Sequence, residues 1–490
     1  MTELFLGVDV GTSSTKGVLV DGVGRVLAQT TREHKVDNPA PGRFEMDGAI
    51  WWDEFVSIAR ELVGTVGADA TVAAVGVSGM GPCVQLTDAN NKPTTPSALY
   101  GVDMRATAEI EELNDELGAE AIFERTDSYL TTQAAGPKLR WFARHAPDAY
   151  ARASRFHMPA SLLVAHLTGE YVLDRQSASQ CTPLYDAATQ EWHTAWAEAV
   201  APGIDLPRLA WAGDEAGRIT AAAASATGLP EGIPVAVGTV DAWAEGLSVG
   251  ATKPGDLMLM YGTTMFLVGN TTGRVRHPNM WGTTGLEPGQ YNLAGGMATS
   301  GAITTWLRDL TGADYATLSA EAAPSTPGAN GLLMLPYFAG ERTPIQDPDA
   351  RGTIIGLTLA HTRGDLYRAA LEATAFGVRH NVEAYADAGV PIERVVAVGG
   401  GTTGSLWPQI VTDVIGRPQV LREKSVGASF GDAFLAARLL DDSLDIDTWN
   451  PAAQTLEPQP GPYDELYQHY RALHEATRAT QHALAARQRG

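Results

Sequence analysis

The stretch LFLGVDVGTSSTKGVLVDGVGRVLAQT (residues 4–30) decides the fold of this chain. Residues 4–10 form an apolar run typical of a buried strand, and residues 15–20 and 25–30 predict two more strands. Residues 11–14 supply the first turn, and residues 21–24 supply the second, because Asp-Gly is a frequent hairpin dipeptide. We therefore expect the chain to open with an antiparallel meander of three strands.

The first turn of this meander carries groups that suit a phosphate and a metal ion. Gly11 lets backbone N–H groups approach an anion closely, and Thr12 and Ser13 add hydroxyl donors. Lys16 supplies a positive charge, and Asp9 suits a hydrated Mg²⁺, which typically takes one or two carboxylates plus phosphate oxygens. The turn is not a Walker A loop, so an ordinary hairpin with a solvated lysine remains the alternative.

A second strand–turn unit, IPVAVGTVDAWAEGLSVG (residues 233–250), presents Asp241 just past an apolar run and a Gly-Thr turn. Enzymes with α/β folds place a base at the end of a sheet in this way. The alternative is a structural aspartate at a helix N-terminus, stabilised by the helix dipole. The recurrence of this unit in both halves suggests two related domains that face one cleft.

Two segments between these units suit the recognition of a small polar ligand. The strand at residues 72–78 runs into a glycine-bearing loop that begins at Met80 and Gly81, which is typical of a pocket wall or of a simple connection. Asp103 and Arg105 can hydrogen-bond polyol hydroxyls or each other, and a surface ion pair is the more frequent explanation for such a pair.

The second half shows two more glycine-bearing turns. A strand at residues 256–260 ends in Gly262, Thr263 and Thr264. A strand at residues 395–398 opens onto Gly399, Gly400, Gly401 and Thr402. Consecutive glycines are entropically costly, so this run favours a loop that lies against a ligand and exposes N–H groups at a helix start. Helices are expected at 49–63, 364–388, 407–415, 427–440 and 463–488, with an α-rich insertion over 105–228.

Length and composition indicate an α/β protein with two large domains. The 490 residues are 44% hydrophobic and 19% charged, and the net charge of -22 makes nucleic-acid binding unfavourable. The two cysteines build neither a disulfide framework nor a zinc site, so a reducing cytoplasm is the simplest expected setting. We see no signal peptide and no apolar run long enough to span a membrane. The expected units are residues 1–244, residues 245–445 and a helical extension over 446–490.

Several motifs resemble those of the FGGY carbohydrate kinases. Residues 9–16 (DVGTSSTK) are similar to the family's first phosphate motif, Asp-x-Gly-Thr-x-Ser-x-Lys. Residues 352–372 (GTIIGLTLAHTRGDLYRAALE) look like its long C-terminal signature, and residues 399–409 (GGGTTGSLWPQ) resemble its adenosine-binding motif, with Gly404 where a serine is common. FEMD (44–47), ERTP (341–344) and PKLRWF (137–142) also look like family segments, although Gln133 and Ala135 depart from the last. The likeness covers about residues 4–440.

The resemblance implies a two-domain actin/Hsp70/hexokinase-like (ribonuclease H-like) α/β ATPase fold with an interdomain cleft. It implies transfer of phosphate from ATP to a sugar hydroxyl, with Asp241 as the general base and Asp9 organising Mg²⁺, largely through water. By the same resemblance, the nucleotide and the sugar would meet the following residues: Thr12, Ser13, Lys16, Gly262, Thr263 and Thr264 for the phosphates; Gly399, Gly400, Gly401 and Thr402 for the adenosine; and Met80, Gly81, Asp103 and Arg105, with Asp241, for the sugar.

The expected substrate is a small ketose, because the C-terminal half looks most like xylulose kinases. Those enzymes usually carry Gln-Met-His where this chain has Met80, Gly81 and Pro82, and Trp-Asn where it has Gly101 and Val102. Such changes in polar contacts shift specificity strongly. D-xylulose therefore leads a class that includes ribulose, erythrulose, erythritol and glycerol-like polyols. A non-catalytic sugar or nucleotide sensor is the competing function, and a homodimer is expected from the resemblance alone.

Overall fold

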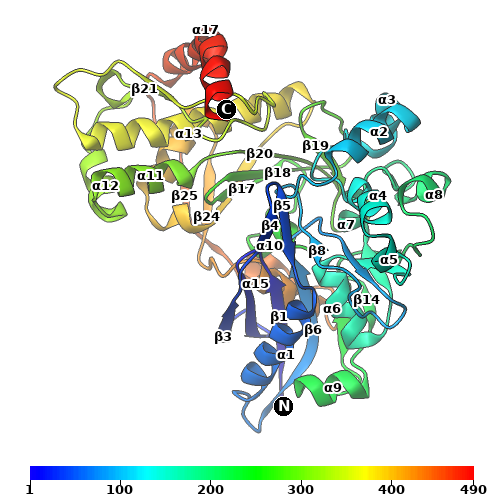
Figure 1. Cartoon of the computed structure of the whole chain (residues 1–490). Helices are drawn as coiled ribbons and strands as arrows, with labels where there is room; N and C mark the ends of the chain where they lie inside the picture. The colour runs from blue at the N-terminus through cyan, green and yellow to red at the C-terminus, as the bar shows by residue number, and fades with distance from the viewer. Residues whose placement is uncertain (490) are drawn as a thin grey trace.

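The computed structural model describes residues 1–489 and contains two seven-stranded sheets (Figure 1). The first sheet has the order β14-β15-β6-β1-β2-β3, and β16 also pairs with β6. Its strands are β1 (Thr2–Val10), β2 (Ser14–Asp21), β3 (Val26–Glu33), β6 (Ala70–Gly79), β14 (Glu215–Arg218), β15 (Pro234–Ala236) and β16 (Thr239–Val240). Strand β2 pairs antiparallel with both β1 and β3, so the predicted opening meander is confirmed.

The second sheet has the order β19-β20-β18-β17-β23-β24-β25. Its strands are β17 (Asp256–Tyr261), β18 (Met265–Thr271), β19 (Trp281–Thr284), β20 (Tyr291–Met297), β23 (Arg394–Val398), β24 (Gln419–Arg422) and β25 (Ala452–Leu456). The path β20-β18-β17-β23-β24-β25 repeats the strand senses of β3-β2-β1-β6-β15-β14: antiparallel twice, parallel twice, then antiparallel. The two sheets are therefore related, but not through the two strand–turn units compared in the sequence: β15 and β16 of the second unit belong to the first sheet, and β17–β18 are the counterpart of β1–β2.

Helices cover both faces of the first sheet. Helix α1 (Ala49–Val63) buries Trp51, Phe55, Ile58 and Leu62, whose spacing forms one apolar stripe, against the face that contains Gly17. The opposite face contains Gly7 and Gly76 and receives α15 (Ala428–Arg438). A Cβ built on Gly7 would lie 1.9 Å from Ser429 O, and one on Gly76 would lie 1.9 Å from Asp432 O, so only glycine permits this approach.

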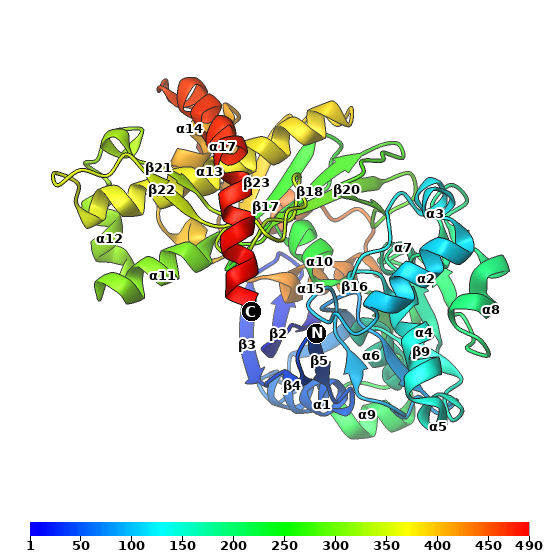
Figure 2. The ribbon, with the colours of Figure 1, turned by 45° about the horizontal axis from the view of Figure 1, so that its top comes forward.

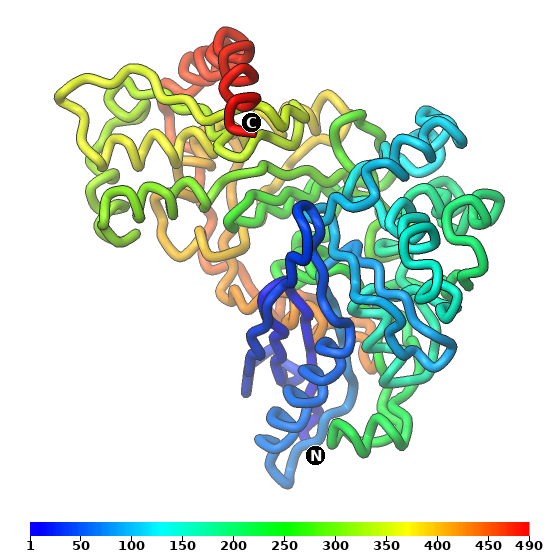
Figure 3. Tube along the Cα trace, viewed as in Figure 1, coloured from blue at the N-terminus to red at the C-terminus, as the bar shows by residue number. Residues whose placement is uncertain are grey.

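Helix α15 brings the last third of the chain back onto the first sheet. In Figures 1 and 3 its orange segment lies beside the blue strands, far from the red terminus. It crosses α10 (Asp241–Ser248), and a Cβ on Gly431 would lie 2.1 Å from Ala244 O. The chain therefore passes between the two sheets three times, after α10, before α15 and again after α15 to reach β25, and α10 and α15 pack on each other.

The region between the first and last strands of the first sheet is rich in helices, as predicted. It contains α2 (Thr107–Leu117), α3 (Ala119–Thr126), α4 (Ala135–His145), α6 (Pro159–Thr168), α7 (Arg175–Ser179) and α9 (Ala221–Thr227). A small sheet has the order β4 (Asp37–Ala40), β5 (Arg43–Met46) and β8 (Ser97–Ala98).

The second sheet is covered by α11 (Gly301–Thr311), α13 (Arg363–Asp387) and α14 (Leu406–Ile415). The terminal helix α17 (Tyr463–Arg489) lies beside α13 in Figure 2, and its Tyr463, Tyr467 and Tyr470 pack on Phe376. Among residues 1–489, no helix has the length and apolar character needed to cross a membrane.

Candidate active site

Where the first sheet meets α15, the hydroxyl of Ser78 joins two carboxylates, Asp9 from the sheet and Asp432 from α15. Asp9 lies two residues after Gly7, and Ser78 two residues after Gly76, so their side chains point toward α15 as well. Ser78 Oγ lies 3.1 Å from Asp9 Oδ1 and 2.7 Å from Asp432 Oδ2, so the two carboxylates share one hydroxyl. Asp432 is fully buried, and its Oδ1 has no hydrogen-bond partner among the described residues.

Helix α10 adds two more carboxylates to this region. Asp241 is its first residue, and its Oδ1 accepts a hydrogen bond of 2.7 Å from Ala242 N–H. Glu245 lies one turn later on the same face, and the backbone N–H of Ala428, the first residue of α15, lowers its pKa. Glu245 therefore lies near the start of α15.

Lys16 is a cation beside these carboxylates. It lies opposite Asp9 where β2 pairs with β1. Its Nζ lies 3.5 Å from Val426 O, just before α15. A Cβ built on Gly427 would lie 3.8 Å from Lys16 Nζ and 3.4 Å from Glu245 Oε2, so the two charged groups approach Gly427 together.

The acidic groups raise one another's pKa values. Burial, followed by the neighbouring charges of Asp241 and Glu245, raises the pKa of Asp9, and burial raises that of Asp241. Burial and the Asp241 charge raise the pKa of Glu245 to about 7, with Lys16 opposing them. Burial and the Asp9 charge raise the pKa of Asp432 well above its ordinary value. The cluster thus holds more negative charge than its surroundings neutralise.

This donor set fits a hydrated Mg²⁺ better than a dehydrated metal ion. Within residues 1–489, no three His, Cys, Asp or Glu side chains are arranged as a preformed metal site. Magnesium commonly keeps several waters and takes one or two carboxylates plus phosphate oxygens. Asp9, with the unpartnered buried oxygen of Asp432 beside it through Ser78, supplies such carboxylates.

Two glycine-bearing hairpin turns occupy equivalent places in the two sheets. In the first, Gly11 N donates to Ser14 O at 3.0 Å, and in the second, Gly262 N donates to Thr264 O at 3.1 Å. Thr12 and Ser13 lie in the first turn, and Thr263 lies in the second. The second turn also rests on the start of α11, because Thr263 O accepts from Ser300 N and Ala302 N. Both turns present backbone and hydroxyl groups suited to phosphate oxygens.

The glycine run after β23 leaves its backbone accessible. Gly399 has a φ of 98°, and a Cβ there would lie 2.6 Å from Tyr261 O, so this position requires glycine. Gly401 packs against Trp407, whereas nothing lies within 4 Å of a Cβ built on Gly400. Thr402 Oγ1 donates to Gly399 O at 2.8 Å and closes the turn. The exposed backbone at Gly400 is available to a flat ligand.

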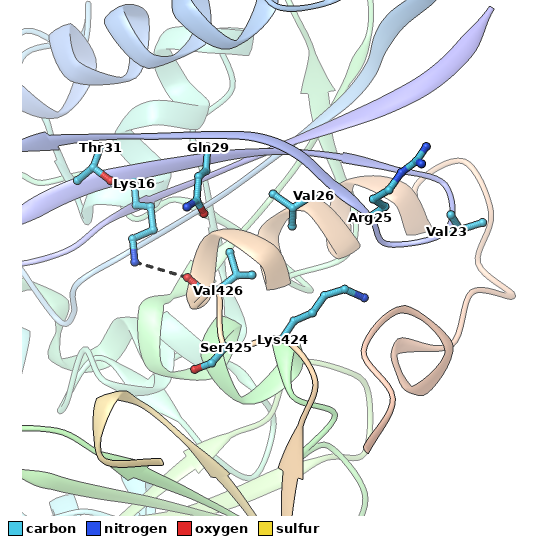
Figure 4. Close-up of a pocket in the computed structure, with 9 residues that line it drawn as sticks. All are labelled: Lys16, Val23, Arg25, Val26, Gln29, Thr31, Lys424, Ser425 and Val426. Carbon is cyan, nitrogen blue, oxygen red and sulfur yellow. Dashed lines mark hydrogen bonds between the residues drawn. The ribbon is translucent and has the colours of Figure 1, made fainter. Parts of the chain in front are cut away.

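A solvent-open cavity of about 600 Å³ lies between β2, β3 and the segment before α15 (Figure 4). Its lining contains three cations and no carboxylate, although the chain as a whole is strongly acidic. Lys16 belongs both to this lining and to the neighbourhood of the acidic cluster, so the cavity suits an anionic group that approaches Lys16. The lining residues are Lys16, Val23, Arg25, Val26, Gln29, Thr31, Lys424, Ser425 and Val426.

Asp103 and Arg105 form a buried ion pair, so the expectation of a surface pair is wrong. Their side chains are 0% and 1% exposed, and Arg105 Nε and Nη2 each donate to Asp103 at 2.8 Å. Arg105 also pairs with Glu45 at 2.8 Å and lies over the Trp141 ring. The small sheet and α4 enclose this pair, a contact between segments that local sequence does not reveal. Glu45, at 19% exposed, is the member of this network with an accessible carboxylate.

The loop after β6, which the sequence suggested as a pocket wall or a simple connection, is largely buried. Met80 is 1% exposed and belongs to the hydrophobic core beneath α1 and α6. Gly81 packs against Val240, with its Cβ position 2.6 Å from Val240 Cγ2, just before Asp241. The loop therefore supports the start of α10.

Gly101 and Gln133 form a matched pair. A Cβ on Gly101 would lie 2.0 Å from Gln133 Oε1, so the carboxamide occupies the space that a larger residue at position 101 would fill. Next to it, Tyr100 OH lies 3.1 Å from Thr12 Oγ1 in the first phosphate turn. Gly101 and Gln133, two of the departures from the family pattern noted above, thus lie in contact.

Sequence reasoning missed Ser78, Glu245 and Asp432 as members of the acidic cluster. The four-residue spacing of Asp241 and Glu245 on one helix face is a signal that could have identified Glu245. Ser78 ends a predicted buried strand next to β1, which places it near Asp9. Asp432 carries no local signal, because it meets Ser78 across 354 residues of sequence.

Known proteins match this chain over nearly its whole length. Residues 4–247 match the N-terminal domain, and residues 257–440 the C-terminal domain, of the FGGY family of carbohydrate kinases. A xylulose kinase from Staphylococcus xylosus is 26% identical over 438 residues, covering 88% of this chain and 90% of that protein. A glycerol kinase from Nocardia farcinica is 32% identical over 481 residues, covering 92% of this chain and 95% of that protein.

Solved structures show the same relationship. The xylulose kinase from Rhodospirillum rubrum superposes with a TM-score of 0.91 at 34% identity, covering 98% of this chain and all of that one. Plasmodium falciparum glycerol kinase with ADP shares the fold, with a TM-score of 0.89 at 20% identity, covering 98% of each chain. This protein therefore belongs to the FGGY family of carbohydrate kinases and has their two-domain α/β fold, as a phosphotransferase whose acceptor is an alcohol group.

Proposed function

We propose that this protein transfers the γ-phosphate of ATP to a hydroxyl of a small ketose, with Asp241 as the general base. The observation that carries the proposal is the position of Asp241: it begins α10, beside Asp9 and the first phosphate turn, with a raised pKa. In the reaction the acceptor oxygen attacks the γ-phosphorus, its proton passes to Asp241, and ADP leaves. Phosphoryl transfer requires mostly positioning and neutralisation of charge, so one base with suitable donors suffices.

The nucleotide side follows from the turns already described. Thr12, Ser13 and Lys16 face the phosphates from the first sheet, and Gly262, Thr263 and Thr264 face them from the second. Gly399, Gly400 and Gly401, with Thr402, lie against the adenosine. Asp9 and Asp432 would hold Mg²⁺, which when bound would neutralise charge on the phosphate oxygens.

The proposed acceptor is a pentulose such as xylulose. Xylulose kinases recur among the relatives, including the structure with the TM-score of 0.91, but a glycerol kinase is 32% identical. The contact of Gly101 with Gln133 places a carboxamide, which can both donate and accept hydrogen bonds, beside Tyr100. Other ketoses and polyols, including ribulose, erythrulose, erythritol and glycerol, therefore belong in the test.

The test is coupled ADP release with a panel of ketopentoses, ketotetroses, ketohexoses and polyols, using wild type and Asp241→Asn. One sugar should stimulate turnover in the wild type, and the substitution should reduce that turnover by orders of magnitude. The control is Asp115→Asn, because Asp115 is an exposed aspartate of α2, outside the acidic cluster. Retention of turnover by Asp241→Asn contradicts its role as base. Sugar binding without ADP release by the wild type supports the sensor instead.

A further inference from the structure

Arg342 is a half-buried arginine that forms no ion pair with a carboxylate within residues 1–489. It lies in the loop after β21 (Leu333–Leu335), and its Nη2 donates to Met297 O, the last residue of β20, at 2.8 Å. Its Nε is buried and has no hydrogen-bond partner within residues 1–489. Gly296 lies directly beneath it, because a Cβ there would be 3.2 Å from Nη2. The guanidinium is thus held from one side and keeps free donors on the other.

Glu341, the acidic residue beside Arg342 in sequence, forms no ion pair with it. Glu341 Oε1 accepts the backbone N–H groups of Ala298 at 2.6 Å and of Arg342 at 2.8 Å, and Glu341 is 5% exposed. The polar partner of the guanidinium in the described part of the chain is the carbonyl of Met297, not a carboxylate. Taking a charge out of water is costly, so burial lowers the pKa of Arg342, and the charges of Glu341 and Tyr100 oppose this only in part. An arriving anion would remove that cost.

Tyr100 connects this arginine to the phosphate turn and to the base. The Tyr100 hydroxyl lies 3.1 Å from Thr12 Oγ1. Its pKa is raised, chiefly by burial, and the charges of Asp241 and Arg342 act on it in opposite directions. Met297, whose carbonyl accepts from Arg342, pairs with Met265 across β18 and β20, and Met265 directly follows Thr264 of the second glycine turn. Arg342 therefore lies at the end of the second sheet that carries this turn.

We propose that Arg342 is a catalytic residue that binds the phosphoryl group during its transfer. This inference rests on the function proposed above. As the bond from phosphorus to the acceptor oxygen forms and the bond to the ADP oxygen breaks, Nη1 and the second N–H of Nη2 donate to the phosphoryl oxygens. The acceptor proton goes to Asp241, and Arg342 neither gains nor loses one. Arginine suits this task because its planar donors match two phosphate oxygens at once, whereas lysine presents a point charge.

The experiment compares Arg342→Ala, Arg342→Lys and Arg342→Gln with the wild type, and Arg417→Ala serves as the exposed control. We expect kcat to fall by about 10²–10³-fold in the alanine variant, the usual loss for one oxyanion donor. The KM for sugar should change little. Lysine should restore only part of the rate, and added guanidinium should rescue the alanine variant. The glutamine variant keeps a donor for Met297 O and replaces the alanine variant if that one does not fold.

A binding measurement separates this role from general damage to the site. We expect Arg342→Ala to bind ADP as the wild type does, but to lose most of the added affinity that aluminium fluoride gives to the complex with Mg²⁺, ADP and sugar. An unchanged kcat with a higher KM for sugar would show that Arg342 reads sugar hydroxyls, and would overturn the proposal. If Asp241→Asn also retains turnover, the proposed function fails; if only the Arg342 variants do, this inference alone fails.

Discussion

Replacing Glu245 with glutamine should stabilise the protein, and more so at high pH than at low pH. The carboxylate lies beside Asp241 and Asp9, and burial with the Asp241 charge raises its pKa from 4.5 to about 7. Between these pH values the folded state binds this proton more tightly than the unfolded state does. Stability therefore falls as pH rises through that window, and the loss is complete above the folded pKa.

The size of the effect follows from the shift. At about 1.4 kcal/mol per pKa unit, the ionised Glu245 costs at most about 3 kcal/mol at pH 8, and under about 1 kcal/mol at pH 5. Because this side chain keeps some contact with solvent, we expect the glutamine variant to gain about 1–2 kcal/mol more at pH 8 than at pH 5.

The assay is urea unfolding at pH 5, 6.5 and 8 without Mg²⁺ or ATP, followed by tryptophan fluorescence and by circular dichroism. Coincidence of the two probes checks that unfolding is cooperative in this two-sheet protein. Glu111→Gln is the control, because Glu111 is an exposed helical glutamate outside the cluster. A gain in stability that is equal at pH 5 and pH 8 would refute the reasoning, since it would show that the charge of Glu245 costs nothing.

Three further results are expected. Because the base must be ionised and burial raises the pKa of Asp241, kcat/KM should decline on acidification well above pH 4, and a profile that is flat to that pH contradicts the role. Mg²⁺ with ATP at 100 times the Kd should raise the free energy of unfolding by about 3 kcal/mol, and Asp9→Asn should remove the Mg²⁺-dependent part; an equal response in the variant would exclude Asp9 from metal binding. Gly7→Ala should prevent the docking of α15 and sharply lower the yield of folded protein, whereas Gly22→Ala, with nothing within 4 Å of the new Cβ, should behave as wild type; folded, stable Gly7→Ala protein would refute the packing argument.

Features that depend on near neighbours in sequence were predicted well. The opening meander, helix α1 and helix α14 lie within three residues of their expected bounds, because apolar periodicity and turn residues act over a few positions. The glycine turns and Asp241 were recognised for the same reason, since each follows an apolar strand. The motif resemblance then supplied the family, which the comparisons confirm.

The exposure of charged residues was predicted less well. Asp103 and Arg105 look like a surface pair from their spacing, yet Glu45 and Trp141 enclose them. Gly101 and Gln133 were each noticed as departures from the family pattern, but not their contact. These errors have one cause: burial of a polar side chain is decided by what packs over it, and the covering residues come from other segments.

Sequence alone determined the strands, the turns and the family of this protein, because strand alternation, turn chemistry and phosphate motifs are written in short stretches. Only the tertiary structure decided which carboxylates share the site. Ser78 lies 69 residues from Asp9 and 354 from Asp432, and Gly7 and Gly76 admit α15 only because they lack side chains. Charges act through space rather than along the chain, so the raised pKa values of the cluster and the unpaired guanidinium of Arg342 exist only once both halves have folded together.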